Sequence, residues 1–482
     1  MVENKPQKLM SKGNYFFDHI KSIIKDSGQL NSMLITYLLN SSFDEVAEDS
    51  RTVHRRANLI RLLVVFKLLD IKSVKSAITG EWGKLFSFGK DVLYKVKNNT
   101  KHNWRKMLLE NSYQCTKGVT IEIDSKDSSK TSCFIIDDTD ISKKGKTIEW
   151  IGRIFSHVTH RYDLGFKSLN LAYWSGKHLL HIDFSYHVEK GKKGNQGMKK
   201  KELENRYTKQ RDKNTPGYKR CEEIIKKKTN CAISMLRRAI SKGYEAQYIL
   251  VDSWFFNITL AKFAISHKIH LISRPKFNNW KYTYKERTYT IGQLVKKLRY
   301  SKDKKWNRQL RLHFIAINVV FKEVELQLFL FKEKKRGTKW QAIITTNKTL
   351  SALKAYRIYQ NRWTIESSYK ELKQYLGYGK SMSRDFDGQI ADATHILMAY
   401  NMLSHIKAIE DHQTIGQLFG AISQNWLKPT IMQKFWRIVT EALTVLADFL
   451  GTPIDDLFRL ILNENEFLTN LQKLNYALTT ET

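Results

Sequence analysis

The segment QYILVDSWFFNITLAKFAISHKIHLIS, residues 247–273, has the pattern of a strand, a helix and a second strand. An apolar run over residues 247–251 ends on Asp252, a helical period covers residues 254–267, and a second apolar run covers residues 269–273. Strand–helix–strand alternation builds parallel sheets with helices on their faces, and an uninterrupted apolar run is typical of a strand buried on both sides. This segment therefore predicts the centre of an α/β fold.

Further strands are predicted on both sides of this segment. Upstream, short β-branched or apolar runs bounded by polar residues or Gly cover residues 119–123, 132–136, 166–174 and 178–184. Downstream, aromatic-rich basic segments with strand character, notably residues 280–289 and 312–331, interrupt the alternation before a core strand at residues 341–345. A long helix is predicted next, over residues 349–376.

The two ends of the chain have helical patterning. Apolar residues recur at spacings of three and four over residues 14–109, and again over residues 387–482 with breaks near Gly420, Pro429 and Pro453. We therefore expect five regions: a helical N-terminal region at 1–115, the first part of an α/β core at 116–275, a β-rich insertion at 276–339, the second part of the core at 340–385, and a helical C-terminal region at 386–482.

The charge of the chain points to a polyanionic partner. The 482 residues include 82 Lys and Arg against 47 Asp and Glu, a formal net charge of +35. Because Lys and Arg release condensed counterions when they neutralise phosphates, nucleic acid is the expected partner. The length excludes a minimal binding module, and 42% hydrophobic residues exclude wholesale disorder.

A membrane location is not expected, because no stretch reaches the about 18 uninterrupted apolar residues of a spanning helix. The first residues lack the apolar core of a signal peptide, and the four cysteines, Cys115, Cys133, Cys221 and Cys231, lie too far apart for a zinc knuckle. We expect free thiols and a cytoplasmic protein.

Acidic residues are the candidates for chemistry. Asp137 and Asp138 follow the apolar run 133–136, Asp252 follows the run 248–251, and Glu366 lies in the long helix. Carboxylates beside buried strands are costly unless they are paired or bind a cation. Two Mg²⁺ or Mn²⁺ ions about 4 Å apart would satisfy them and would support phosphoryl transfer. The alternative is that strand-end Asp residues cap helices or turns.

Four polar residues share one stripe of the long helix. The spacings place Tyr359, Arg362, Glu366 and Lys373 within about 60° of arc, at about 100° per residue. A carboxylate for a metal ion, flanked by Arg and Lys for phosphates, fits DNA cleavage. The alternative is a surface ladder of ion pairs between Glu366, Arg362 and Lys370.

Two other features leave alternatives open. Residues 71–78 and 87–97, separated by Gly80, resemble a helix-turn-helix carrying basic residues, a pattern that is also common in helical domains without DNA. The basic stretch 189–228 is either a solvated surface excursion or an arm that contacts phosphates.

The pattern Y-x-x-R-x-x-x-E-x-x-x-x-x-x-K, from Tyr359 to Lys373, resembles the signature of bacterial insertion-sequence transposases of the insertion sequence 4 family. Ile136-Asp137-Asp138-Thr139, followed by Lys143-Lys144-Gly145-Lys146, is similar to that family's first acidic block. Leu250-Val251-Asp252-Ser253-Trp254-Phe255 is similar to the second. The resemblance covers about residues 115–400.

The resemblance implies a DDE transposase with a ribonuclease-H-like catalytic domain: an α/β fold with a mixed sheet, flanking helices and a β-rich insertion before the Glu. It implies a catalytic and metal-binding triad of Asp137, Asp252 and Glu366, with Asp138 as the alternative first acid, and two Mg²⁺ or Mn²⁺ ions. Residues implied to bind DNA are Tyr359, Arg362, Lys373, Lys143, Lys144 and Lys146, with Trp280 and Trp306 as candidates for stacking on a displaced base.

We expect a transposase that cuts both ends of a mobile element and joins their 3′-hydroxyls to target DNA, acting as a homodimer on double-stranded DNA. The expected location is the bacterial cytoplasm, with nucleoid association when DNA is bound. Two alternatives remain: a metal-dependent DNA nuclease of the same fold without strand transfer, and a non-catalytic DNA-binding derivative.

Overall fold

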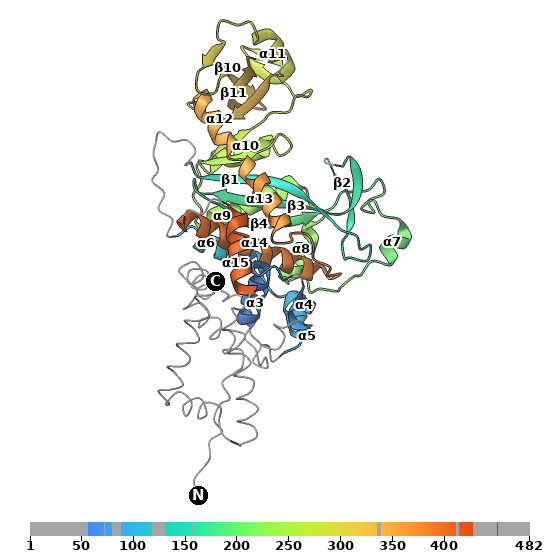
Figure 1. Cartoon of the computed structure of the whole chain (residues 1–482). Coiled ribbons are helices and arrows are strands. Elements are labelled where there is room, and N and C mark those ends of the chain that lie inside the picture. The colour runs from blue at the N-terminus through green and yellow to red at the C-terminus, as the bar shows by residue number, and fades with distance from the viewer. Residues whose placement is uncertain are drawn as a thin grey trace, which may run out of the picture. The chain divides into compact units, whose positions relative to one another are not determined.

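The computed structural model describes residues 56–71, 73–79, 88–117, 131–156, 159–334, 339–410, 414–427 and Gly451. The chain divides into two compact units, Met1–Phe419 and Gly420–Thr482. The sheet and the candidate sites described below belong to the first unit, whose elements are shown in Figure 1.

Twelve strands form one mixed sheet in the described part of the chain. Their order is β2-β3-β1-β5-β6-β12-β11-β10-β7-β8, with β4 beside β3 and β9 beside β10. The strands are β1 Cys133–Ser142, β2 Gly152–Ser156, β3 Arg161–Trp174, β4 Leu179–His187, β5 Tyr248–Val251, β6 His270–Ser273, β7 Tyr282–Tyr284, β8 Arg287–Tyr289, β9 Lys305–Asn307, β10 Leu312–Phe321, β11 Val324–Glu333 and β12 Gln341–Thr345.

The centre of the sheet is parallel and its flanks are antiparallel. β5 pairs in parallel with both β1 and β6, whereas β3 pairs antiparallel with β1. β12 pairs antiparallel with β6 and with β11, so the strands of residues 276–339 continue the same sheet. The predicted α/β class with a mixed sheet is confirmed.

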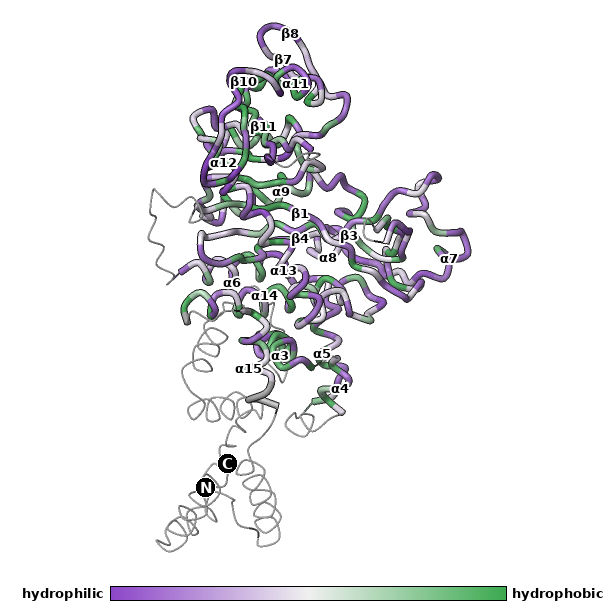
Figure 2. The backbone as a smooth tube through the Cα atoms, turned by 45° about the horizontal axis from the view of Figure 1, so that its top comes forward, coloured by the Kyte–Doolittle hydropathy of each residue, from purple (hydrophilic) through white to green (hydrophobic). Residues whose placement is uncertain are grey.

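Helices pack on this sheet and on one another. α9 contacts β3 and β4, α13 contacts β1 and β4, and α14 contacts β4, α3 and α6. Figure 2 shows hydrophobic residues concentrated in the central strands, whereas the segment around α7 is mainly hydrophilic. The helices are α3 Arg56–Leu68, α4 Val74–Thr79, α5 Lys90–Lys97, α6 Trp104–Gln114, α7 Lys200–Glu204, α8 Pro216–Glu223, α9 Lys228–Lys242, α10 Ile258–Ser266, α11 Ile291–Leu298, α12 Ala352–Gln360, α13 Trp363–Gln374, α14 Phe386–Glu410 and α15 Ile415–Leu427.

The single helix predicted over residues 349–376 is wrong: two helices, α12 and α13, stand there. At the junction, backbone N–H groups bond three residues back, as from Arg362 to Tyr359 and from Ile365 to Arg362. Such bonds are typical of a tighter 3₁₀ turn. The apolar period continues through the turn, so sequence spacing alone does not reveal it.

Other element limits also differ from the prediction. Gly420 lies inside α15 and does not separate helices, because α14 already ends at Glu410. Gly89 precedes α5 as its cap, while Ser87, where the predicted second helix begins, and the connection 80–87 lie outside the described residues. The predicted strand 119–123 and the predicted breaks at Pro429 and Pro453 also lie outside them.

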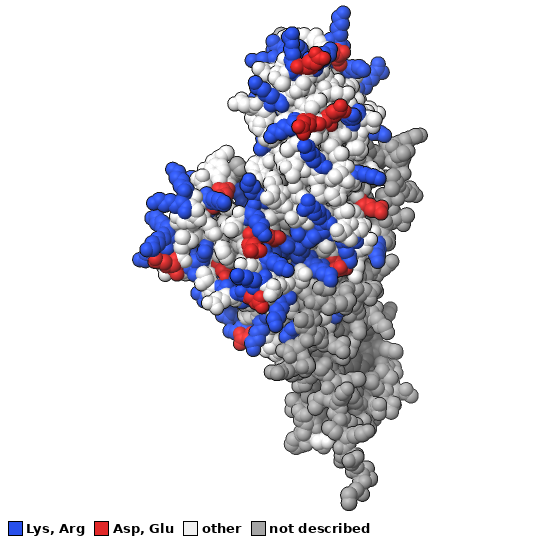
Figure 3. Space-filling view, turned by 180° about the vertical axis from the view of Figure 1, so that it is seen from behind, with Lys and Arg blue, Asp and Glu red and all other residues white. Residues whose placement is uncertain are grey.

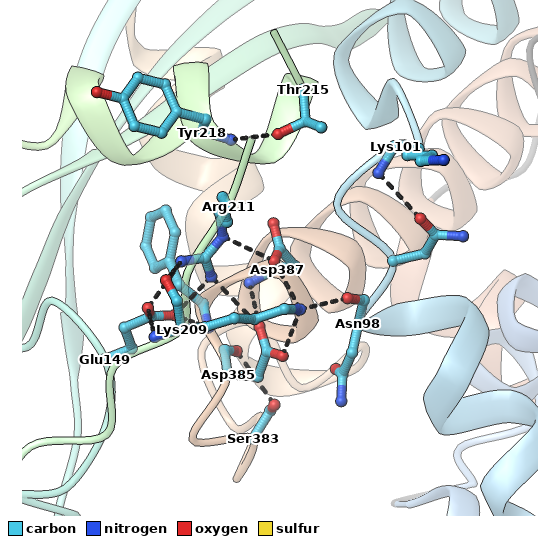
Figure 4. Close-up of polar contacts among 12 residues, drawn as sticks. Asn98, Lys101, Glu149, Lys209, Arg211, Thr215, Tyr218, Ser383, Asp385 and Asp387 are labelled. Atoms are coloured by element: carbon cyan, nitrogen blue, oxygen red, sulfur yellow. Dashed lines mark hydrogen bonds and ion pairs between the residues drawn. The ribbon is translucent and has the colours of Figure 1, made fainter. Parts of the chain in front are cut away.

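The basic stretch 189–228 is neither a simple solvated excursion nor a free arm along its whole length. The Arg211 guanidinium binds Glu149 at 2.6 Å and Asp387 at 2.9 Å. Lys209 Nζ donates to Asp385 at 2.8 Å and to Asp387 at 3.0 Å. Figure 4 shows these side chains converging between the basic stretch and the start of α14. Lys209 and Arg211 therefore fasten the stretch to the core.

The four cysteines are free and buried. Among the described residues, no helix is both long enough and apolar enough to cross a bilayer.

Gly165 allows β1, β2 and β3 to pair closely. It pairs with Ser142 in β1 and Gly152 in β2, and a Cβ placed on it would lie 2.2 Å from the backbone oxygen of Ile141. Because that neighbour is backbone, Gly165→Ala should destabilise the protein by at least about 1–3 kcal/mol and lower the thermal midpoint. Circular dichroism on heating measures this.

Gly145→Ala is the matched control, since the nearest atoms to its added methyl group belong to Ile148 at 3.5 Å. Equal midpoints for the two variants would contradict the packing constraint.

Candidate active site

The first two acids lie on neighbouring parallel strands at the same level. Ile136 in β1 pairs with Val251 in β5, so Asp137 and Asp252 each follow one member of this pair. β5 ends there, whereas β1 continues to Ser142. The expectation that Asp137 lies after a strand is therefore wrong, because antiparallel pairing with β3 extends β1 past it.

Hydrogen bonds to the sheet hold α12 and α13 beside these acids. The hydroxyl of Tyr359 donates to the Val251 carbonyl at 3.3 Å, and that of Tyr369 donates to the Asp137 carbonyl at 3.1 Å. Further along, Lys373 Nζ donates to Thr139 Oγ1 at 2.8 Å. The helix pair is thereby fixed along the ends of β1 and β5, with both tyrosines buried.

Arg362 links the first acid to the third. Its Nη1 lies 3.3 Å from Asp137 Oδ2, and its Nη2 lies 2.6 Å from Glu366 Oε1. The Arg362 side chain is buried, and its guanidinium also lies over the rings of Tyr359 and Trp363. Because one guanidinium contacts both carboxylates, Asp137 and Glu366 face a common point.

The surroundings of the site disfavour the charged form of its carboxylates. Burial raises the pKa of Asp137 to about 7, and the charges of Asp138 and Asp252 add to this rise, while Arg362 opposes it. Burial also raises the pKa of Asp252, although the backbone N–H groups of Phe255 and Trp254 stabilise its charged form. Crowded carboxylates with raised pKa values mark a candidate functional site and favour a cation there.

Asp252 has a second role that the sequence left open. Its Oδ1 accepts hydrogen bonds from the backbone N–H groups of Trp254 at 2.9 Å and Phe255 at 3.1 Å. The capping alternative is therefore correct for this oxygen, and it fixes the carboxylate at the end of β5.

The two adjacent acids of β1 have different partners. Asp137 faces Arg362, whereas the carboxylate of Asp138 forms an ion pair with Lys228 at the start of α9. Successive side chains of a strand point to opposite faces, which accounts for the separation. The geometry favours Asp137 as the first acid, and the choice between the two stays a prediction.

The donor set fits a divalent metal ion in its chemistry, because carboxylate oxygens are the ligands that Mg²⁺ and Mn²⁺ prefer. The crowding of Asp137 by Asp138 and Asp252 is the kind of repulsion that a cation relieves. In the described residues, however, no three Asp, Glu, His or Cys side chains stand close enough together to form a ready metal site.

The residues expected to bind DNA have diverse environments. Lys143 Nζ donates to the carbonyls of Gly379 and Ser381 and to Gln389, so it fastens the loop before α14. Lys144 and Lys146 are exposed, and Lys146 pairs with Glu202 at 3.2 Å. Trp280 stacks on Phe321 with ring centroids 5.2 Å apart, whereas Trp306 is 42% exposed.

Sequence reasoning missed two cations at the site. Lys228 pairs with Asp138 and lies 4.1 Å from the ring centre of Trp254, an exposed residue beside Asp252. Arg274 lies over the ring of Tyr359 at 5.8 Å. Neither belongs to a local motif, and Lys228 meets Asp138 across 90 positions of sequence, so no spacing signal could have found them.

Two protein-family models match the chain. Residues 123–283 match a model described as DDE superfamily endonuclease, and residues 225–402 match one described as Transposase DDE domain. These matches support a DDE transposase. Asp137 lies within the first match, Glu366 within the second and Asp252 within both. DDE superfamily domains have a ribonuclease-H-like fold and use divalent metals, so the predicted ribonuclease-H-like class is confirmed. A comparison with curated proteins finds no match.

Asp137→Asn should stabilise the metal-free protein at high pH. The folded-state pKa of Asp137 is about 7 against 3.8 as its ordinary value, so the folded chain holds this proton more tightly. The wild type therefore loses stability as pH rises from about 4 to 7, at up to about 1.4 kcal/mol per pKa unit, and the Asn variant does not. Thermal midpoints in chelator at pH 5 and pH 8 measure this.

The matched control is Asp303→Asn, at an exposed carboxylate in the segment before β9. A midpoint difference between Asp137→Asn and the wild type that is the same at both pH values would contradict the assignment.

Proposed function

We propose that this chain is a transposase of the kind found in the insertion sequence 4 family, which cuts the ends of a mobile element and joins the freed 3′-hydroxyls to target DNA. The observation that carries the proposal is the contact of Arg362 with both Asp137 and Glu366, beside Asp252, whose charge adds to the effect of burial on the pKa of Asp137. The three acids come from positions 115 and 114 residues apart along the chain. Carboxylates can hold metal ions, and an arginine beside them can bind a DNA phosphate. Together these groups suit phosphodiester chemistry.

In this proposal Asp137, Asp252 and Glu366 hold two Mg²⁺ or Mn²⁺ ions, with Asp138 as the alternative first acid. Such ions, when bound, activate a water or 3′-hydroxyl and stabilise the leaving oxygen of a phosphodiester. Arg362 neutralises Asp137 and Glu366 in the metal-free protein, and its two Nη groups would be free to bind a DNA phosphate if metal ions held these carboxylates. Tyr359 orients Arg362 through ring contact.

The DNA path is proposed to run over basic surface around this centre. Figure 3 shows Lys and Arg side chains spread over one face of the molecule, with fewer Asp and Glu between them. Exposed Lys144 and Lys146 would contact phosphates, Lys373 would lie near the scissile strand, and residues 1–115 would add DNA contacts. A homodimer that pairs two ends completes the proposal, which places the protein in the cytoplasm and on the nucleoid when bound.

A nuclease of the same fold that cuts without joining is the second candidate, because the endonuclease family match covers Asp137 and Asp252. Analysis of reaction products for strand transfer separates the two. A non-catalytic derivative is disfavoured, since none of the three acids is replaced.

Glu366→Gln should abolish cleavage of DNA carrying the element's ends in Mg²⁺, at least a thousandfold, while changing DNA affinity less than threefold. The amide keeps the shape of the side chain but loses the charge that faces Arg362 and a metal ion. Gel-based cleavage and binding assays measure the two effects.

Glu204→Gln, at a carboxylate whose side chain is 62% exposed in α7, serves as the control and should cut normally. Cleavage by Glu366→Gln at the wild-type rate would refute the catalytic role.

The two tryptophans proposed to stack on a base should respond differently to truncation. Trp306→Ala should weaken DNA binding by about 1–3 kcal/mol with little loss of stability, because the indole is 42% exposed. Trp280→Ala should instead lower the thermal midpoint, since its ring packs on Phe321 and Phe256. DNA binding and thermal unfolding of both variants test this, and a stable Trp280→Ala protein with impaired DNA binding would reverse the assignment.

A further inference from the structure

A cationic pocket lies away from the three acids, where α6 and α8 begin. Its volume is about 230 Å³, and its lining includes His102, Asn103, Trp104 and Arg105 at the start of α6 and Pro216 and Gly217 at the start of α8. The positive ends of two helix dipoles therefore meet at one cavity. A helix dipole attracts negative charge at its N-terminus, although the N–H groups of Gly217 and Tyr218 in α8 already donate to Thr100 and Thr215.

Four cationic side chains reinforce this preference. Arg105, Lys219, Arg220 and Arg238 line the pocket, and Asp387 is the one carboxylate that lines it among the described residues. Asp387 is already bound by Lys209 and Arg211. These two cations are shared with Glu149 and Asp385, so Asp387 is partly compensated, and the four cations that line the cavity outnumber it.

The three arginines share too few carboxylates to be fully paired. Arg105 binds Asp183 at 3.0 Å and Glu223 at 2.5 Å, and Arg238 binds the other oxygen of Asp183 at 2.7 Å. Arg220 has only a long contact of 3.6 Å to the same Glu223. Three guanidinium groups thus share the two carboxylates of Asp183 and Glu223, so one positive charge has no matching carboxylate. Lys219 adds a second positive charge.

Arg220 is the group left without full compensation. It is 5% exposed, and its Nη1 donates to the Phe184 carbonyl, while its Nη2 has no hydrogen-bond partner among the described residues. Burial, together with the charge of Arg105, lowers the pKa of Arg220 to about 10. A buried cation with incomplete pairing is costly, and an anion in the adjoining cavity would offset that cost.

We propose that this pocket binds a phosphate group, held by Arg220, Arg105, Arg238 and Lys219 between the starts of α6 and α8. Its volume lies below the range of about 300–1,000 Å³ that is typical of sites for whole small molecules, and suits a compact anion. Such a group comes from the backbone of nucleic acid or from free phosphate. In both cases an arginine guanidinium can bind two oxygens of the tetrahedral phosphate at once.

The first test uses inorganic phosphate and the full chain without divalent metal. Phosphate titrated at constant ionic strength should raise the thermal midpoint of the wild type, as expected for a ligand that binds only the folded state. Lys219→Glu should weaken this apparent affinity at least tenfold. Lys219 is exposed, so the variant should fold normally. Arg220→Lys, which keeps the charge but removes the fork, should weaken it as well.

Lys213→Glu is the control, because it makes the same charge change at an exposed residue outside the pocket lining. It should keep wild-type affinity for phosphate. The proposal is overturned if phosphate stabilises the wild type no more than chloride does, or if Lys219→Glu responds to phosphate as the control does.

The second test separates the two sources with duplex DNA of arbitrary sequence. If a backbone phosphate occupies the pocket, Lys219→Glu should bind DNA more weakly than Lys213→Glu, with a slope of log affinity against log salt that is smaller by about one. If free phosphate is the ligand, the two variants should bind DNA equally while differing in phosphate affinity. Neither readout involves cleavage, so failure here is distinguishable from failure of the transposase proposal.

Discussion

The pairing of Ile136 with Val251 is the constraint on which the candidate site depends. It sets the two central strands in one register, so that the carboxylates that follow on β1 and β5 stand at the same level of the sheet. Burial is the main cause of the raised pKa of Asp137, and the negative charge of the half-buried Asp252 beside it adds to that rise. Arg362 opposes part of this rise in pKa by binding Asp137, and it also binds Glu366. Glu366 is thereby held near Asp137, and the 3₁₀ turn between α12 and α13 places Arg362 where it can reach both carboxylates.

Three ion clusters among the described residues differ in how the charge they leave over is compensated. Around Arg211, the three acids Glu149, Asp385 and Asp387 are held by two cations, Lys209 and Arg211, and by backbone N–H groups, including those that donate from Phe386 to Glu149 and from Asp387 to Asp385. Such a cluster holds elements together and needs no ligand. Around Asp137 the carboxylates outnumber the cations, and around Arg220 the cations outnumber the carboxylates. Because uncompensated charge is costly in a low-dielectric interior, the first imbalance favours a metal ion and the second favours an anion. How the imbalance is compensated therefore distinguishes a structural network from a binding site.

The sequence predicted what depends on local pattern and missed what depends on tertiary contact. The runs that became β5, β6 and β12 are apolar and short, and a buried strand needs no more than that to be recognised. The three acids followed from their places beside such runs and from the spacing around Glu366. By contrast, β1 continues beyond Asp137 only because β3 pairs with it, and Lys143 is tied to Gln389 across 246 positions. Trp280 and Trp306 are the same residue type in similar basic surroundings, and only the ring of Phe321 distinguishes a packed indole from an exposed one.

The adjacent acids of β1 show how one strand can place two neighbouring carboxylates in different surroundings. The pleat turns neighbouring side chains to opposite faces, so Asp137 meets Arg362 while Asp138 meets Lys228 at the start of α9. An ion pair with Lys228 keeps the charge of Asp138 largely satisfied, and the cation also rests against the ring of Trp254. If Lys228 were absent, Asp138 would add its full repulsion to Asp137 and Asp252, whose pKa values it already raises. Through its ion pair with Asp138, Lys228 thus reduces the negative charge near Asp137 and Asp252.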